Sequence, residues 1–219
     1  MRRRAGLSGV ALAALCLAAV GCGSERTVTG SGNVVSRTVA VEEFTRLEAQ
    51  QTFQVRVSSG SAPKVVLHAD DNVLPELDVG VSGDTLHLKL KSDVSTRQAT
   101  LRADVTVPKL EGISASGASQ VEGPVKFDEG TIELSGASRT VLSGSVGKLE
   151  IDASGASGVD SPELTVGTLD IELSGASRAE LTVTDSLSAA LSGASSLRYR
   201  GSPQVTKSDV SGGSSIIHL

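Results

Sequence analysis

The sequence has very few aromatic residues and only two cysteines among its 219 residues. It contains no Trp, one Tyr and three Phe, so the rings that anchor the core of a typical globular enzyme are nearly missing. We therefore expect a core built from Val, Leu, Ile and Ala in a regular arrangement. Cys16 and Cys22 both lie close to the N-terminus, so disulfides and thiolate metal sites are not expected in the body of the protein.

The first 21 residues have the pattern of an export signal. Residues 2–4 are Arg, and the apolar run from Val10 to Val20 is too short to span a bilayer as a mature helix. The residues before Cys22 (Ala, Val and Gly at 19–21) resemble the lipobox read by the lipoprotein signal peptidase. The resemblance implies cleavage before Cys22 and lipidation of its sulfur. Plain secretion with an unmodified Cys22 is the alternative.

Basic residues become scarcer once this signal is removed. Lys and Arg fall from 20 to 17 against 25 Asp and Glu, which leaves a net charge of −8. Nucleic acids select basic surfaces, so we exclude them as partners. Gly23 follows Cys22, and in a Gram-negative host this resembles a lipoprotein sent on to the outer membrane. We expect a cell-envelope protein attached to a membrane by its lipid, with residues 22–29 as linker and 30–219 as one domain.

A short motif, SGAS, returns throughout the second half of the chain. It occurs five times and is followed by one SGGS, and the first serines are separated by 19, 19, 20, 18 and 19 residues. The first two residues of each copy are Ser116 and Gly117, Ser135 and Gly136, Ser154 and Gly155, Ser174 and Gly175, Ser192 and Gly193, and Ser211 and Gly212.

The residues around each motif alternate between apolar and charged, which is typical of a strand with one buried face. Three residues before the motif stand Ile113, Ile132, Ile151, Ile171, Ala189 and Ser208. A period of about 19 residues has no room for a helix in addition to two strands, and it is about half the length of a propeller blade. Equivalent strands must then stack in parallel, about 4.8 Å apart. The sequence predicts an all-β fold, a parallel β-helix (solenoid) with coils of about 19 residues.

The motif serines are interpreted as corners of the coil, not as nucleophiles. Glycine gives each corner its freedom in φ, and the serine hydroxyl can hydrogen-bond nearby backbone. An active site needs one nucleophile, and this chain has six near-identical candidates. Its three histidines, His68, His87 and His218, are not brought beside a motif serine by their spacing.

Residues 30–110 lack the strict period but still read as strands, separated by Gly and Pro. We expect irregular coils that continue the solenoid and cover its first end, while residues 111–219 form the regular repeat part. A separate antiparallel sandwich is the alternative for the N-terminal part. A solenoid needs such protection at an open end.

Three stretches carry a resemblance to a known family: GSGNVVSRTVAVEEFTRLEA at 30–49, ADDNVLPELDVGVSGDTLHL at 69–88, and the repeats from Ile113 onward. The chain resembles the head GIN domain family, described as putative auto-transporter adhesins. The resemblance implies a β-helix similar to that of pectate lyases, no identified catalytic residues, and a role in adhesion.

The register of the repeats predicts columns of carboxylates on one outer face. Glu133, Asp152 and Glu172 are expected in one column, with Glu150 and Asp170 in the next. The simplest interpretation is a solvated face, since water and nearby cations screen the repulsion. A calcium site is the alternative, because hard cations prefer carboxylate oxygens, and the carboxylates of a lyase are another. We expect no other cofactor and no other metal.

These observations favour a non-enzymatic envelope lipoprotein that contacts a surface glycan or protein through a face of the β-helix. One alternative is a carbohydrate-active enzyme, a polysaccharide lyase or glycoside hydrolase, which needs a groove where acidic and basic groups converge. Another is a structural envelope protein that self-associates as a homo-oligomer. Fold alone does not decide among them.

Overall fold

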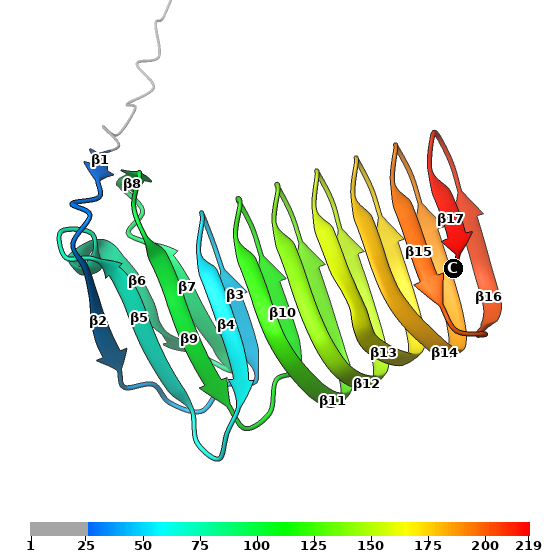
Figure 1. Cartoon of the computed structure of the whole chain (residues 1–219), viewed down its shortest axis with the longest axis horizontal. Helices are drawn as coiled ribbons and strands as arrows, with labels where there is room; N and C mark the ends of the chain where they lie inside the picture. Colours follow the sequence, from blue (N-terminus) through cyan, green and yellow to red (C-terminus); the bar gives the residue numbers. More distant parts are fainter. Residues whose placement is uncertain (1–25) are drawn as a thin grey trace, which may run out of the picture.

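The structure, a computed structural model, describes residues 26–219 as a nearly all-β solenoid (Figure 1). The predicted parallel β-helix with a spacing of about 19 residues is confirmed. Within the described part of the chain the only helix is one 3-10 turn, Leu74–Glu76, and no helix is long and apolar enough to cross a membrane. The predicted signal peptide and Cys22 lie outside the described residues.

Four long strands form the regular coils: β11 (Gln120–Leu134), β12 (Arg139–Ala153), β13 (Gly158–Leu173) and β14 (Arg178–Leu191). Each bends midway, so that its first half lies in one sheet and its second half in the opposite sheet. In β11, for example, residues 120–122 pair with β4 whereas 131–134 pair with β10. Hydrogen bonding is therefore continuous over 15 strands, although the molecule has two facing sheets.

The first sheet contains the first halves of the long strands and runs in the order β2–β5–β9–β4–β11–β12–β13–β14–β15–β17. Pairing is parallel except for β2 with β5 and β5 with β9. The additional strands are β2 (Val34–Val39), β4 (Gln54–Ser59), β5 (Lys64–Asp70), β9 (Leu101–Val107), β15 (Ser196–Arg200) and β17 (Ser215–His218).

The second sheet contains the second halves of the long strands and runs β6–β7–β3–β10–β11–β12–β13–β14–β16. Only β6 and β7 pair antiparallel. Its additional strands are β3 (Arg46–Ala49), β6 (Leu77–Ser82), β7 (Thr85–Leu90), β10 (Gly112–Ala115) and β16 (Gln204–Val210). A separate two-stranded parallel sheet joins β1 (Arg26–Thr29) to β8 (Val94–Arg97).

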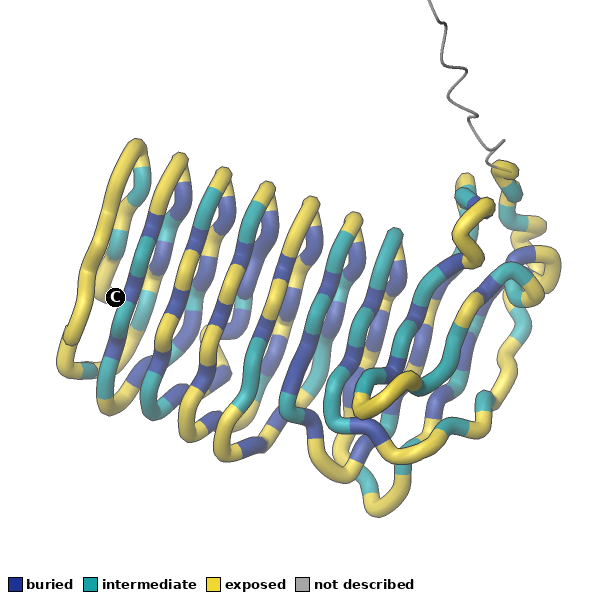
Figure 2. Tube along the Cα trace, turned by 180° about the vertical axis from the view of Figure 1, so that it is seen from behind, coloured by how far each residue is buried: buried dark blue, intermediate teal, exposed yellow. Residues whose placement is uncertain are grey.

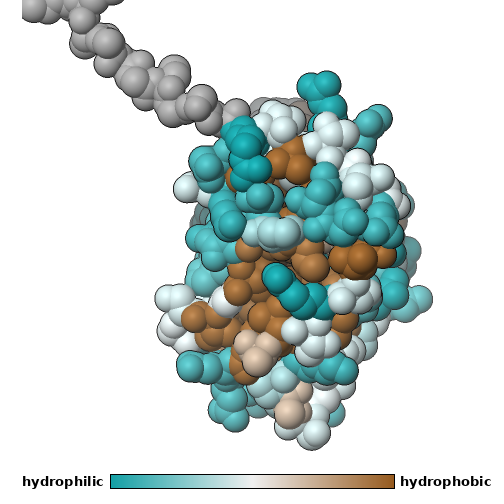
Figure 3. Space-filling view, turned by 90° about the vertical axis from the view of Figure 1, so that its left-hand side faces the viewer, coloured by the Kyte–Doolittle hydropathy of each residue, from teal (hydrophilic) through white to brown (hydrophobic). Residues whose placement is uncertain are grey.

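The irregular N-terminal residues extend both sheets of the solenoid. Strands β4 and β3 stack on the repeat block in parallel, one in each sheet. Beyond them the chain switches to antiparallel strands, and β2 and β6 form the outermost edges of the two sheets (Figure 1). Apolar side chains gather at this N-terminal end (Figure 3), where the partly buried residues include Val39, Val41, Val79 and Val81.

Between the motifs, residues such as 128–130 and 185–186 predict a loose return from one sheet to the other, but the structure differs from this expectation. In β11 and β12 the strand continues through this bend, and Glu129 lies in register with Lys148. Parallel pairing with the neighbouring coil explains the difference, because the backbone groups of the bend are satisfied by the next bend and need no separate loop.

The core consists of columns of like apolar residues between the two sheets, and burial alternates along the inner coils (Figure 2). One column joins Leu47, Ile113, Ile132, Ile151 and Ile171, and no member exposes more than 2% of its surface. Stacked branched side chains thus replace the missing aromatic anchors. Phe53, which is fully buried, is an exception at the boundary between the irregular and regular coils.

Candidate functional site

The SGAS motifs lie at the sharp corners of the coil, opposite the bends. The six corner glycines have φ between +68° and +76°, a range that favours glycine. The corners also stack closely: the amide of Ala156 donates to the carbonyl of Gly136 at 2.7 Å, and Ala137 does the same to Gly117. These contacts give the motif a structural role at each corner.

The fourth residue of the motif, which the sequence analysis did not single out, is the serine that points inward. Ser119, Ser138, Ser157, Ser177 and Ser195 expose at most 1% of their surface. The Ser157 hydroxyl donates to the carbonyl of Ser154 at 2.7 Å, and three others make the equivalent bond. Ser119 is the exception and has no hydrogen-bond partner. The four bonded hydroxyls close their corners, and all five serines are buried away from any ligand.

The acidic residues lie in the expected columns on the outside of the second sheet. Glu133 is in register with Asp152, and Asp152 with Glu172. Glu150 is in register with Asp170 in the adjacent column. Within residues 26–219, however, no group of three or more Asp, Glu, His or Cys side chains converges closely enough to hold a metal ion. The columns are therefore rows of separate carboxylates.

A polar hollow of about 260 Å³ lies on the other side of the molecule, on the outside of the first sheet. It crosses four neighbouring strands, β5, β9, β4 and β11, and contains both acidic and basic groups. Its lining residues are Gln54, Val55, Arg56, His68, Arg102, Asp104, Gln120 and Glu122.

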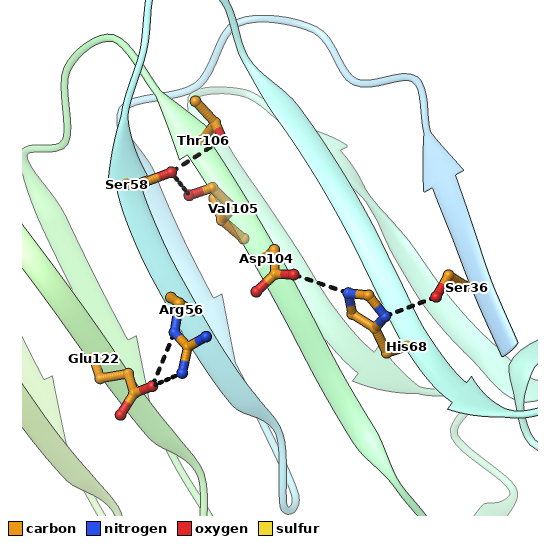
Figure 4. Close-up of polar contacts among 8 residues, drawn as sticks. All are labelled: Ser36, Arg56, Ser58, His68, Asp104, Val105, Thr106 and Glu122. Atoms are coloured by element: carbon orange, nitrogen blue, oxygen red, sulfur yellow. Dashed lines mark hydrogen bonds and ion pairs between the residues drawn. The ribbon is translucent and has the colours of Figure 1, made fainter. Parts of the chain in front are cut away.

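A hydrogen-bonded chain of three side chains borders this hollow (Figure 4). The Nδ1 atom of His68 lies 2.8 Å from Oγ of Ser36, and its Nε2 atom lies 2.8 Å from Oδ2 of Asp104. With the ring proton on Nε2, His68 donates a hydrogen bond to Asp104 and accepts one from the hydroxyl of Ser36. Antiparallel pairing creates the arrangement, because Ser36 and His68 lie directly opposite each other on β2 and β5.

An ion pair lies on the opposite side of the hollow (Figure 4). Oε1 of Glu122 accepts from Nη2 of Arg56 at 2.8 Å and from Nε at 3.1 Å. The hydrogen bond and the charge of Glu122 raise the pKa of Arg56 above its usual range. Both side chains are partly exposed, at 71% and 39%, so their polar atoms remain accessible to a ligand.

The hollow continues along the solenoid as a shallow groove with a more apolar floor. A second hollow shares Arg56, Asp104 and Glu122 with the first, and a third shares Gly123 and Val141 with the second. Pro124 and Pro162 also line this part. The groove spans six strands from β9 to β14, or about 24 Å at the spacing of a β-sheet. Its length suits an elongated ligand.

Sequence reasoning missed this site because six of the eight residues that line the first hollow come from parts of the chain that carry no repeat. His68 was noticed only as one of three scattered histidines. The alternation in PKVVLHA indicates that His68 faces the same side as Val66 and Lys64, but it does not identify the strands on either side. A search for hydroxyl and carboxyl residues facing outward on β2 and β9 would have found Ser36 and Asp104 only once the strand order was known.

Fold and site together define a β-solenoid with a groove along one of its two sheets. The sequence matches the family described as putative auto-transporter adhesin, head GIN domain, over residues 43–203, and the chain belongs to this family. A comparison with curated proteins finds no match.

Several solved structures share the fold. A putative adhesin from Bacteroides fragilis superposes with a TM-score of 0.73 at 20% identity, covering 88% of this chain and 100% of its own. A putative adhesin from Parabacteroides distasonis gives a TM-score of 0.61 at 17% identity, covering 89% and 100%. A protein described as a putative lipid binding protein, from the same species, gives 0.58 at 16% identity, covering 89% and 100%. At these identities the likeness establishes the fold alone.

Proposed function

We propose that the protein is a non-enzymatic adhesin of the bacterial cell envelope, and that it binds a surface glycan along the groove of the first sheet. The observation that carries the proposal is the convergence of Arg56, His68, Arg102 and Asp104 in one hollow on rigid strands. Family membership and the names of the structural neighbours support adhesion as the general role.

The chemistry of the groove favours a sugar polymer over a protein segment. Carboxylates accept and guanidinium groups donate hydrogen bonds, so a hydroxyl can satisfy both at once. The apolar floor at Val141, Pro124 and Pro162 provides contact for the C–H faces of a sugar ring. Because the strands fix these groups, little ordering entropy is lost on binding.

A glycan array probed with the purified protein tests this proposal. We expect binding to hydroxyl-rich polysaccharides that is weakened when Arg102 is replaced by Ala. Binding to immobilised envelope proteins but to no glycan would refute a glycan as the ligand and show that the ligand is a protein. Release of shortened products from a bound glycan would show that the protein is an enzyme and would refute the non-enzymatic proposal.

One observation favours a second candidate function, a hydrolase. The order Ser36, His68, Asp104 places a hydroxyl beside an imidazole that a carboxylate orients, which is the arrangement of an activated serine. The test is hydrolysis of ester and acylated-glycan substrates by the wild type and by Ser36→Ala. Hydrolysis that is lost in Ser36→Ala supports this candidate, and equal background rates in both proteins exclude it.

We further infer that the protein is attached to the outer membrane through a lipid on Cys22. The support is the lipobox-like sequence before Cys22 and the position of β1, which begins four residues after it, at the N-terminal end of the solenoid (Figure 1). Labelling with a radioactive fatty acid tests the inference. We expect the label in the wild type and none in Cys22→Ala. Equal labelling of both proteins, or labelling of neither, would refute the inference.

A further inference from the structure

The last coil leaves a strand edge open in each of the two sheets. Within residues 26–219, β16 pairs only with β14 and β17 only with β15, so their outer N–H and C=O groups have no strand partner. All seven residues of β16 are exposed. The apolar residues Val205, Val210, Ile217 and Leu219 expose between 44% and 50% of their surface. Such an edge is a template for another chain.

We propose that this end binds the same end of a second copy, so that two solenoids join end to end around a two-fold axis. A two-fold axis normal to the sheets pairs β16 with β16 and β17 with β17, in both cases antiparallel. Both sheets then continue from one copy into the other, and the unpaired backbone groups find partners.

The charges of β16 select one register for this pairing. When Ser208 lies opposite its own copy, Lys207 faces Asp209 of the second copy and Asp209 faces Lys207, giving two opposite-charge pairs. A register centred on Lys207 or on Asp209 places like charges directly opposite each other, which is destabilising. Within one chain Lys207 Nζ already lies 3.4 Å from Asp209 Oδ2, so the dimer contains four alternating charges.

The same axis suits the other sheet and the core. Ser208 lies three residues before the SGGS corner at 211–214, and Ile217 lies three residues after it. The two residues are thus equally far from the corner, and the axis that places Ser208 opposite Ser208 also places Ile217 close to Ile217 of the second copy. Val205 and Val210 continue the buried columns of Leu187 and Leu191. The second copy therefore covers apolar side chains that are exposed at this edge.

This arrangement gives the proposed adhesin a second mode of action, and this step rests on the envelope attachment proposed above. The first described strand, β1, and the last one, β17, lie at opposite ends of the solenoid (Figure 1). Two copies joined through their C-terminal ends thus direct their N-terminal ends away from each other. If each N-terminus is held in a membrane, the dimer links two facing cells.

Charge variants test the contact with the full-length chain purified after export. Lys207→Glu leaves only acidic charges on β16, and Asp209→Lys leaves only basic ones. We expect each variant alone to dimerise at least about tenfold more weakly than wild type in sedimentation velocity, because like charges then face each other. An equimolar mixture of the two is expected to recover the dimer. A wild type that stays monomeric, or a mixture no better than its components, overturns the proposal.

A matched pair at the other end of the solenoid controls for net charge. Lys89 and Asp78 lie 3.5 Å apart near the N-terminal end, and Lys89→Glu and Asp78→Lys change the charge by the same amounts. We expect both to dimerise like wild type.

Cysteine variants test the position of the contact. Ser208→Cys is expected to give a disulfide-linked dimer, because directly opposed residues of antiparallel strands lie within disulfide reach. Ser82→Cys, on the β6 edge at the other end of the solenoid, is not expected to give one. Cross-linking through Ser82→Cys alone would place the interface at the wrong end.

Aggregation of cells tests the link between surfaces. Cells that display Lys207→Glu are expected to clump only when mixed with cells that display Asp209→Lys. If the dimer in solution depends on these charges but the mixed cells do not clump, the contact between copies is supported and bridging between cells is refuted. Clumping of Cys22→Ala cells at the wild-type level would refute the lipid attachment and leave the contact intact.

Discussion

A Cβ atom on Gly155 would lie 2.5 Å from the carbonyl oxygen of Gly136, the corner glycine of the preceding coil. Real Cβ atoms do not approach backbone this closely, and Gly155 also has φ of +75°. Close stacking of the coils therefore requires glycine at this corner for two separate reasons.

The first prediction is that Gly155→Ala destabilises the protein by roughly 1–3 kcal/mol, through left-handed backbone strain and the contact with Gly136. Chemical denaturation measures the free energy of unfolding. Gly80→Ala is the matched control, because its Cβ would meet no atom within 4 Å and its φ is not positive. Equal effects of the two substitutions would contradict the role given to the corner glycines.

The second prediction separates two buried serines of the same motif. Ser157→Ala removes the hydroxyl bonded to the Ser154 carbonyl, and we expect a loss of about 1 kcal/mol. Ser119→Ala removes a buried hydroxyl without a partner and is expected to be neutral or stabilising by up to about 1 kcal/mol. Thermal unfolding of both variants under one condition checks the contrast. A larger loss for Ser119→Ala than for Ser157→Ala would refute this assignment of hydrogen bonds.

The third prediction concerns acid stability. Burial alone would raise the pKa of Glu48, but hydrogen bonds from Gln50 and His87, together with the charge of His87, hold this pKa below its ordinary value of 4.5. A depressed carboxyl pKa contributes stability above the unfolded value, and this contribution is lost as the pH falls through the folded pKa. Glu48→Gln should therefore destabilise the protein at neutral pH, with a difference from wild type that shrinks below about pH 4.5.

Denaturation series at several pH values measure this difference. Glu43→Gln, at an exposed position just before β3, controls for the loss of one negative charge. A difference between wild type and Glu48→Gln that grows as the pH falls below 4.5 would have the wrong sign and would contradict the assignment.

The fourth prediction concerns a buried carboxylate that holds the loop before β2. Asp70 is 1% exposed, and its two oxygens accept the amides of Gly32 at 2.6 Å and Thr100 at 2.7 Å. Asp70→Asn leaves one amide facing an NH₂ group, so we expect a loss of about 1.5–3 kcal/mol. Asp78→Asn, on the surface, is expected to change stability by less than about 1 kcal/mol. Hydrogen exchange of the Gly32 and Thr100 amides locates the effect, and unchanged protection in Asp70→Asn would contradict it.

The regular part of the fold was predictable because each coil repeats the same local solution. The period of SGAS fixes which residues lie side by side in neighbouring coils, so the columns of Ile132, Ile151 and Ile171 could be written down from the sequence. A further corner was not recognised, because Gln51 occupies the glycine position there with φ of 60°. The alternation around it, with Ala49 in register with Ala115 and Val55 with Val121, was the signal that could have identified it.

The candidate site could not be predicted in the same way. Its three hydrogen-bonded side chains, Ser36, His68 and Asp104, meet through antiparallel pairs between strands more than 30 residues apart. Local alternation determines which face a residue occupies, but it does not determine which strands become neighbours. Without a repeat to fix the strand order, the meeting of these groups depends on the tertiary fold.

The most direct test of the account compares ligand binding by two double variants, one on each sheet. Arg102→Ala with Gln120→Ala removes polar groups from the hollow, whereas Glu150→Gln with Asp170→Asn neutralises the acidic column on the opposite sheet. The affinity for a glycan identified on the array is measured for both by titration calorimetry. We predict a fall of about tenfold or more for the first variant, a loss of about 1.4 kcal/mol, and less than about twofold for the second. Unchanged binding by the first variant, together with loss of binding by the second, would contradict the account and move the binding face to the second sheet.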